Sequence, residues 1–426
     1  MRIILEGTAG PEGWPSPGCR CASCGRVTTV RRRLSIVIDG RIRLAPDGPG
    51  HPDDARHHRI PERPERAGDG VRADHSTGGP RSWPEGYLVA HTPDGITVTG
   101  PDGGRLLYAG FHLTATASPP PETRGDRQGD ERPDRDQRSG PERREEPSRP
   151  YDVVLIDPLD RPERLGDLRR RGLVTPRTRV VAVGLDHRVP SEGELARRLA
   201  FWGAEAVSDG TVVDTRDRPL PARTAPRRTL LLGGARSGKS EEAELRLAAE
   251  PHVTYVATGP SGGDDPSWLA RVKAHRDRRP AHWGTAETTD LAELLRTSSG
   301  TLLIDGLGTW IAAVFDECGA WPGYGQEDTH AQSAVPEEAE QKTGRAGAEP
   351  SPLDRVALRC DELVEAWRTT AARVVAVSDE VGLGVIPATA SGRLFRDTLG
   401  RLNQRLARES EDVALVVAGR VLSLPI

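Results

Sequence analysis

The chain has 426 residues, of which 35% are hydrophobic and 29% are charged, with 47 Gly and 36 Pro. The net charge of −4 gives no reason to expect nucleic acid as a partner, and no apolar run approaches the ~20 residues of a membrane span. The five cysteines do not suggest a disulfide framework, and the opening MRIILEGTAGPEG lacks the regions of a signal peptide. We therefore expect a cytoplasmic protein of roughly two or three domains, part of it unstructured.

The first half reads as a series of short strands. They are expected at 2–6, 34–38, 86–91, 95–99 and 105–109, several of them joined by Gly or Asp-Gly turns. Buried strands follow at 151–158 and 178–186, and a helix at 192–207. Stretches rich in Pro and charge at 116–150 and 322–352, and more weakly at 47–83, cannot bury enough apolar surface to fold and are expected to be disordered.

A Pro- and Arg-rich segment at 216–227 is expected to be a linker between domains 1–215 and 228–426. After it, strands at 228–234, 253–259, 300–307, 372–382 and 412–419 alternate with helical segments. One of these, 388–412, has Phe395, Leu399, Leu402 and Leu406 at the spacing of a packed helix face. This alternation predicts an α/β domain with a mostly parallel sheet flanked by helices.

The strongest motif is GGARSGKS, which follows an apolar strand and opens a helical segment. Gly233, Gly238, Lys239 and Ser240 match the phosphate-loop pattern G-x-x-x-x-G-K-[ST]. Glycines let backbone N–H groups converge on phosphate oxygens, the lysine reaches the outer phosphates and the serine ligates Mg²⁺. The expected nucleotide-binding loop comprises Gly233, Gly234, Ala235, Arg236, Ser237, Gly238, Lys239 and Ser240.

Asp305 ends the apolar strand LLID and is expected to be the second acidic element of the site, holding Mg²⁺ with Ser240. The alternative is an ordinary aspartate in a turn that ends a strand.

A basic segment carries His275 among Arg271, Lys273, Arg276, Arg278 and Arg279. A solvated basic helix is the simple interpretation. In a nucleotide enzyme, however, nearby cations keep the imidazole neutral and nucleophilic, and arginines stabilise the charge of a phosphoryl transition state. His275 is thus a candidate for a covalent phosphoramidate.

Six segments in this order resemble the bifunctional adenosylcobinamide kinase/adenosylcobinamide-phosphate guanylyltransferase family of cobalamin biosynthesis. They are GGARSGKS, VTYVATG, RVKAHRDRRPAHWGTAE, LLIDGLGTWI, SDEVGLGVIP and FRDTLGRLNQRLA, and the resemblance covers about 228–426. It implies that ATP or GTP phosphorylates adenosylcobinamide, that GTP then guanylylates a histidine, and that the GMP passes to adenosylcobinamide phosphate.

The resemblance assigns the guanylylated position to His275, with His282 as the weaker candidate, and makes Lys239 catalytic. It also implies a homotrimer. Two positions depart from the family pattern: Asp379 stands where Asn is usual, placing a charge near a phosphate site, and Gly306 stands where Cys is usual. Further residues that it places around the nucleotide are Thr258, Gly259, Arg279, Glu287 and Asp305.

The N-terminal region resembles, weakly, metallo-β-lactamase-fold hydrolases of the phosphodiesterase type, through MRIILEGTAGPEGWPSPGCRCASCGR and 178–212. Their His-x-His-x-Asp-His cluster is missing: 56–59, 74–75 and His91 do not fit it. We therefore expect a shortened α+β domain without hydrolase activity, because no hydroxide-generating metal pair can assemble.

Cys19, Cys21 and Cys24 form a C-x-C-x-x-C segment in which three thiolates can meet one zinc ion, with a remote fourth ligand such as His187. The alternative is three loop thiols without a metal. Two other functions stay open for the whole chain: a nucleotide-binding regulatory or scaffold module without catalysis, and, less favoured, a zinc-dependent hydrolase.

Overall fold

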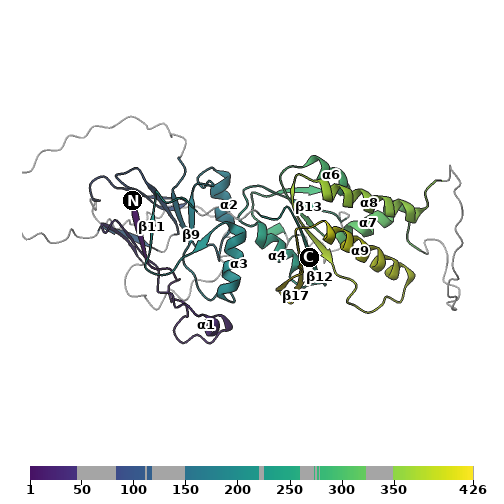
Figure 1. Cartoon of the computed structure of the whole chain (residues 1–426), viewed down its shortest axis with the longest axis horizontal. Coiled ribbons are helices and arrows are strands. Elements are labelled where there is room, and N and C mark those ends of the chain that lie inside the picture. The colour runs from purple at the N-terminus through teal and green to yellow at the C-terminus, as the bar shows by residue number, and fades with distance from the viewer. Residues whose placement is uncertain are drawn as a thin grey trace, which may run out of the picture. The chain divides into compact units, whose positions relative to one another are not determined.

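The computed structural model describes residues 1–45, 83–110, 113–117, 149–219, 225–259, 273, 276–277, 279–322 and 349–425. The chain divides into two compact units, Met1–Arg223 and Thr224–Ile426, both drawn in Figure 1. This division falls inside the segment 216–227. Most of the three stretches expected to be disordered lies outside the described residues.

The first sheet of the N-terminal unit is antiparallel throughout, in the order β11-β1-β2-β3-β7. In β1, Ile3 and Leu5 are buried while their neighbours are not, which is the two-residue period of a strand with one face on the core. Its strands are β1 (Arg2–Gly7), β2 (Ser35–Ile38), β3 (Ile42–Ala45), β7 (Thr114–Ala117) and β11 (Thr211–Asp214).

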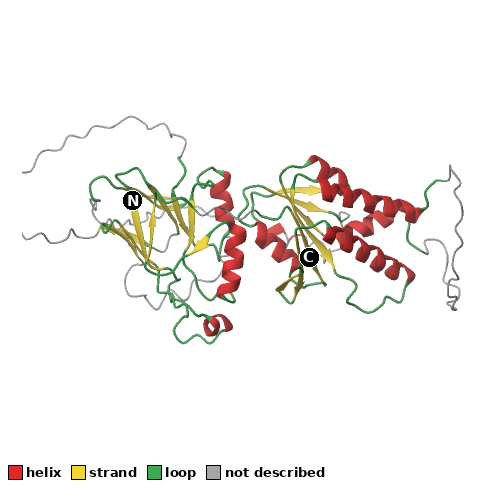
Figure 2. Ribbon diagram, viewed as in Figure 1, coloured by secondary structure: helices red, strands yellow, loops and turns green. Residues whose placement is uncertain are grey.

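The second sheet of this unit is mixed, in the order β10-β9-β8-β6-β5-β4. Its strands are β4 (Leu88–Thr92), β5 (Gly95–Thr99), β6 (Arg105–Ala109), β8 (Val153–Ile156), β9 (Arg179–Ala182) and β10 (Glu205–Ala206). The pairs from β6 through β8 and β9 to β10 are parallel. The two sheets face each other, as Figure 2 shows, and share one core that includes Ile36 and Leu155.

In its described residues the N-terminal unit also has the helices α1 (Ala22–Arg26), α2 (Glu163–Arg170) and α3 (Glu192–Trp202). The side chain of Ser191 accepts a hydrogen bond from the N–H of Glu194 and so caps the start of α3. Gly203 ends α3 in the left-handed conformation, with φ 58°. The expected helix 192–207 was therefore too long, because the chain turns at Gly203 and enters β10.

The C-terminal unit has one seven-stranded sheet in the order β14-β13-β15-β16-β12-β17-β18. Every neighbouring pair is parallel except β17 and β18. This confirms the prediction of a mostly parallel sheet. The strands are β12 (Arg228–Gly233), β13 (Val253–Ala257), β14 (Gly284–Glu287), β15 (Thr301–Asp305), β16 (Arg373–Asp379), β17 (Asp412–Val417) and β18 (Arg420–Ser423).

Helices cover both faces of this sheet. Leu230 and Leu232 of β12 belong to a core built with α6, α7, α8 and α9, whereas Leu231 belongs to a core on the other face built with α4. Burying one such leucine contributes about 1.5–3 kcal/mol, so both helix layers are held to the sheet mainly by apolar burial. The helices are α4 (Lys239–Leu247), α6 (Leu291–Thr297), α7 (Leu307–Cys318), α8 (Pro352–Thr369) and α9 (Ala390–Arg408).

The predicted apolar face of α9 is confirmed: Leu399, Leu402 and Leu406 are buried, and Phe395 packs partly buried against the same core. The strand expected at 372–382 is shorter: β16 begins at Arg373 and ends at Asp379, and the N–H of the next residue, Glu380, donates to the carbonyl oxygen of Gly233 in the phosphate loop. Among the described helices, none combines the length and apolarity that crossing a bilayer requires.

Candidate functional site

The predicted phosphate loop joins the end of β12 to the start of α4. A Cβ on Gly233 would lie 2.5 Å from Oγ of Ser237 and 2.6 Å from the carbonyl oxygen of Val416, so only glycine fits there. Gly238 precedes α4 with φ 96°, a conformation that other residues rarely adopt. These two glycines explain how the strand reverses direction tightly enough to present the first N–H groups of α4 to a phosphate.

Lys239 is the first residue of α4, and its ammonium group points back over the loop. Nζ donates to the carbonyl oxygen of Gly234 at 3.1 Å and forms an ion pair with Oδ1 of Asp379 at 2.9 Å. The Lys239 side chain is 14% exposed and that of Asp379 is 39% exposed. The lysine is thus held beside the loop by the carboxylate of Asp379 and the carbonyl oxygen of Gly234.

Ser240 and Asp305 meet at the carboxyl edge of the sheet. The Ser240 hydroxyl donates to Oδ1 of Asp305 at 2.9 Å. Asp305 is the last residue of β15, which lies between β13 and β16. A hydroxyl and a carboxylate oxygen are both ligands that Mg²⁺ accepts, so this pair fits the predicted metal position.

Tyr255 of β13 was not expected in the site. Its hydroxyl donates to Oδ2 of Asp305 at 2.9 Å, so both oxygens of this carboxylate accept a hydrogen bond. Burial raises the pKa of Tyr255, and the Asp305 charge raises it further, so the phenol stays a neutral donor. Its place in the strand VTYVATG gave no sequence signal, because an aromatic residue there also fits a packed strand.

Arg279 connects the basic segment with this group. Its guanidinium carbon lies 3.5 Å from the centre of the Tyr255 ring, in a cation–π contact. His275 lies outside the described residues, as do Arg271 and Arg278. His282, the weaker candidate, is described, and its Nε2 lies 3.3 Å from the carbonyl oxygen of Glu250.

The remaining expected nucleotide residues lie at the ends of neighbouring strands. Ala257 pairs with Glu287 on one side and with Asp305 on the other, so these two carboxylates are at the same level of the sheet. Thr258 is buried and its hydroxyl donates to the carbonyl oxygen of Gly306 at 2.7 Å, where it steadies the turn into α7. Gly259 follows directly. In parallel sheets such an edge is the usual place of a ligand.

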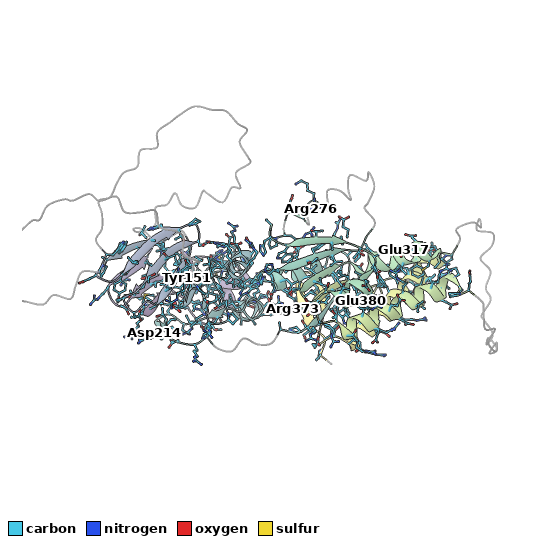
Figure 3. The ribbon with its side chains drawn as sticks, turned by 90° about the horizontal axis from the view of Figure 1, so that it is seen from above. Tyr151, Asp214, Arg276, Glu317, Arg373 and Glu380 are labelled. Carbon is cyan, nitrogen blue, oxygen red and sulfur yellow. The ribbon has the colours of Figure 1, made fainter. Side chains whose placement is uncertain are left out.

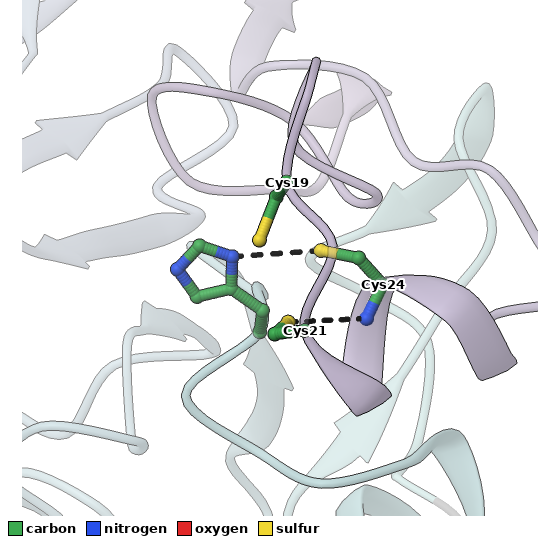
Figure 4. A group of neighbouring side chains, drawn as sticks. Cys19, Cys21 and Cys24 are labelled. Carbon is green, nitrogen blue, oxygen red and sulfur yellow. Dashed lines mark hydrogen bonds between the residues drawn. The ribbon is translucent and has the colours of Figure 1, made fainter.

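A second cluster lies in the N-terminal unit. Cys19, Cys21 and Cys24 belong to the loop around α1, and His187 lies between β9 and α3. Their candidate ligand atoms all lie within 4.8 Å of one another (Figure 4). Cys24 Sγ is 3.5 Å from Nδ1 of His187, and the Sγ of Cys21 accepts from the N–H of Cys24 at 3.4 Å. His187, the remote fourth ligand suggested from the sequence, therefore lies beside the three cysteines.

The environment of the thiols differs within this cluster. The N–H of Cys24 holds the pKa of Cys21 below its usual value, whereas burial raises the pKa of Cys24 to about 11. Among the described residues, this is the group of His, Cys, Asp or Glu that is placed to hold a metal ion. His91 lies on β4 and is exposed, while 56–59 and 74–75 lie outside the described residues.

Comparison with known proteins concerns the C-terminal unit. The family model described as cobinamide kinase/cobinamide phosphate guanyltransferase matches residues 229–424. The bifunctional adenosylcobalamin biosynthesis protein CobU of Salmonella typhimurium is 35% identical over 194 residues, which cover 45% of this chain and 95% of that protein. The protein of the same name from Escherichia coli is 32% identical over 194 residues, with the same coverage.

The bifunctional adenosylcobalamin biosynthesis protein CobP of Pseudomonas aeruginosa is 34% identical over 203 residues, which cover 46% of this chain and 96% of that protein. None of these similarities supports the metallo-β-lactamase resemblance expected for the N-terminal unit. They do support the P-loop character of the C-terminal unit. Through residues 229–424, the chain belongs to the cobinamide kinase/cobinamide phosphate guanyltransferase family.

Proposed function

We propose that this chain phosphorylates adenosylcobinamide with a nucleoside triphosphate and then transfers GMP from GTP to the product, giving adenosylcobinamide-GDP. The observation that carries the proposal is the preassembled phosphate site: the loop at 233–240 with the Ser240–Asp305 pair beside it. It lies in the unit that the family model matches.

In the proposed kinase step, the phosphate loop holds the nucleoside triphosphate by its backbone N–H groups and the start of α4. Lys239 then stabilises charge on the transferred phosphoryl group. Ser240 and Asp305 are the residues proposed to hold Mg²⁺, which, when bound, neutralises phosphate charge. The substrate hydroxyl oxygen attacks the terminal phosphorus, the nucleoside diphosphate leaves, and the hydroxyl proton passes to water.

In the proposed guanylyl transfer, an imidazole nitrogen of His275 attacks the α-phosphorus of GTP and pyrophosphate leaves. A phosphate oxygen of adenosylcobinamide phosphate then attacks the same phosphorus and releases the imidazole. Support comes from Arg279, four residues further along, whose guanidinium lies on the ring of Tyr255 beside Asp305. Arg279, which belongs to the same basic segment of the sequence as His275, thus contacts a residue of the proposed nucleotide site.

The test is the intact mass of the full chain after incubation with GTP and Mg²⁺. We expect one added GMP on the wild type and on His282→Ala, and none on His275→Ala. If the wild type binds GTP but gains no mass, the alternative of a non-catalytic nucleotide-binding module replaces this proposal. If His275→Ala still gains GMP and His282→Ala does not, His282 is the nucleophile in place of His275, and the proposed reaction stands.

We also propose that the chain forms a homotrimer, because the family that it resembles does. Sedimentation velocity at several protein concentrations tests this. A sedimenting species with the mass of one chain or of two at all concentrations would contradict it.

A second proposal concerns the N-terminal unit: Cys19, Cys21, Cys24 and His187 bind one zinc ion. Three sulfur atoms and one imidazole nitrogen match a common ligand set of structural zinc, and their mutual approach within 4.8 Å is close to what a tetrahedral site requires. With four protein ligands no position is left for a substrate, so the proposed role is structural. The site would tie the loop around α1 to the segment before α3.

Metal analysis of the purified full chain tests this site. We expect about one zinc per chain, lost in Cys24→Ala and in His187→Ala. Cys360→Ala is the matched control, since this buried thiol lies on α8 in the C-terminal unit. Absence of zinc from the wild type after growth and purification with zinc present would leave three loop thiols without a metal.

A further inference from the structure

Asp379 lies between two features that attract anions. Its Oδ1 is 2.9 Å from the ammonium of Lys239, the phosphate-loop lysine. Its Oδ2 faces the first turn of α7, where a Cβ on Gly308 would come within 2.5 Å of it. A carboxylate is favoured at a helix N-terminus by the partial positive charge there. The side chain thus has a cation on one oxygen and a helix start on the other.

The backbone holds Asp379 in this place independently of its charge. It is the last residue of β16 and pairs with Gly233 at the start of the phosphate loop. Asn403 of α9 donates to the carbonyl oxygen of Asp379 at 3.0 Å, and the N–H of Glu380 donates to Gly233 at 3.1 Å. Glu380, labelled in Figure 3, directs its Oε1 to the N–H of Gly382 instead, at 2.8 Å.

We infer that Asp379 is an internal counter-ion that occupies Lys239 when no nucleotide is bound and that nucleotide phosphates must displace. The inference rests on the proposed nucleotide binding at the phosphate loop. Lys239 has one ammonium group, and the outer phosphates need it in place of the carboxylate. A bound phosphate also meets the Asp379 charge at close range, which opposes binding until a divalent cation compensates it. Asp379 therefore sets nucleotide affinity and its dependence on Mg²⁺.

Two neutral variants, Asp379→Asn and Asp379→Ser, test this. The probe is GDP, which carries two phosphates and cannot donate GMP with loss of pyrophosphate. Calorimetric titration of the full chain without Mg²⁺ is expected to show GDP binding about fivefold tighter in Asp379→Asn, the size expected for losing a partly exposed ion pair. With Mg²⁺ the gain is expected to shrink, because the cation already offsets the carboxylate charge.

Two further variants separate charge from structure. Asp379→Glu keeps the charge, and Glu380→Gln removes a charge from the adjacent residue that does not contact Lys239. For both variants the dissociation constant for GDP is expected to lie within about twofold of the wild-type value. The inference is overturned if Asp379→Asn and Asp379→Ser bind GDP no more tightly than the wild type. It is also overturned if Glu380→Gln increases the affinity for GDP as much as Asp379→Asn does.

The strand pairing and the Asn403 contact use backbone atoms of Asp379, so both neutral variants are expected to fold, which thermal unfolding checks. If none of the chains binds GDP, the proposed nucleotide site fails, and this inference fails with it. If all bind it equally, nucleotide binding stands and only the inference is lost.

Discussion

The hydroxyl of Ser240 donates a hydrogen bond to Oδ1 of Asp305 across 2.9 Å, although 65 positions separate the two residues. Ser240 comes from the start of α4 and Asp305 from the end of β15, which is not a neighbour of β12 in the sheet. The pair therefore exists only because the sheet order brings β15 close to the phosphate loop. It makes the two proposed Mg²⁺ ligands available together before any nucleotide arrives.

Removing either member of this pair is expected to impair phosphoryl transfer. For Ser240→Ala and Asp305→Asn we expect kcat/KM of the kinase reaction to fall about 100-fold, because each loses a group that supports charge in the transition state. Steady-state rates of adenosylcobinamide phosphorylation at varied Mg²⁺ concentrations measure this kcat/KM. Thr289→Ala is the control, since that hydroxyl donates to Glu317 on α7 and is expected to leave kcat/KM unchanged.

The order of elements could be predicted where the pattern is strong and local. The strands β5, β6 and β12 are found where alternating or continuous apolar residues indicated them. The short strands β3 and β7 were not predicted, because four residues with one or two polar positions do not differ from a loop. They become strands by pairing with each other across residues far apart in sequence.

The site was predictable in its motifs but not in its contacts. The phosphate loop is one continuous segment, so its glycines, Lys239 and Ser240 could be named from spacing alone. The contacts of Tyr255 with Asp305 and of Asp379 with Lys239 join different strands and helices. The sheet order that creates them cannot be read from one sequence. For the same reason His187 was only one candidate for a remote partner of the three cysteines.

A buried ion-pair network fixes α4, which carries the proposed catalytic lysine, to the sheet. Arg246 pairs with Glu242 at 2.6 Å and with Asp412 of β17 at 2.5 Å, and the Arg246 and Glu242 side chains are 5% and 7% exposed. Arg246→Leu leaves two carboxylates without this cation, so we expect the free energy of unfolding to fall by about 3 kcal/mol. Urea unfolding followed by tryptophan fluorescence measures it.

Arg368 provides the matched control for that prediction. It pairs with Glu365 and Glu409, but its side chain is 52% exposed. Arg368→Leu is expected to leave the free energy of unfolding close to that of the wild type, because solvent screens an exposed ion pair. Equal losses in both variants would mean that burial does not set the strength of the Arg246 network.

The alkaline stability of the N-terminal unit is expected to depend on Tyr87. Burial raises the pKa of Tyr87 to about 12, and its hydrogen bond to Asp39, 2.6 Å long, also raises it. Because the folded state holds this proton more tightly than the unfolded chain, whose tyrosine pKa is about 10, the contribution is complete below pH ~10 and is lost as pH rises toward 12.

Tyr87→Phe separates this contribution from that of other groups that titrate at alkaline pH. At neutral pH we expect the free energy of unfolding to fall by about 1 kcal/mol, through loss of the hydrogen bond. Between pH 10 and 12 the variant is expected to lose stability less steeply than the wild type. Urea unfolding at several pH values measures both, and equal slopes in the two proteins would show that Tyr87 does not titrate differently on folding.

Tyr255 is expected to orient the Asp305 carboxylate, and its two contacts can be removed separately. Tyr255→Phe keeps the ring beneath Arg279 but loses the 2.9 Å hydrogen bond to Asp305, whereas Tyr255→Leu loses both contacts. Because the proposed metal ligand would then lose one partner, we expect kcat/KM of phosphorylation to fall about tenfold in Tyr255→Phe, with a higher Mg²⁺ requirement. Formation of the GMP adduct is expected to slow only in Tyr255→Leu, because Arg279, a proposed nucleotide-binding residue, then loses the ring that it contacts. Unchanged Mg²⁺ dependence in Tyr255→Phe would mean that Asp305 holds its orientation through Ser240 and the strand alone.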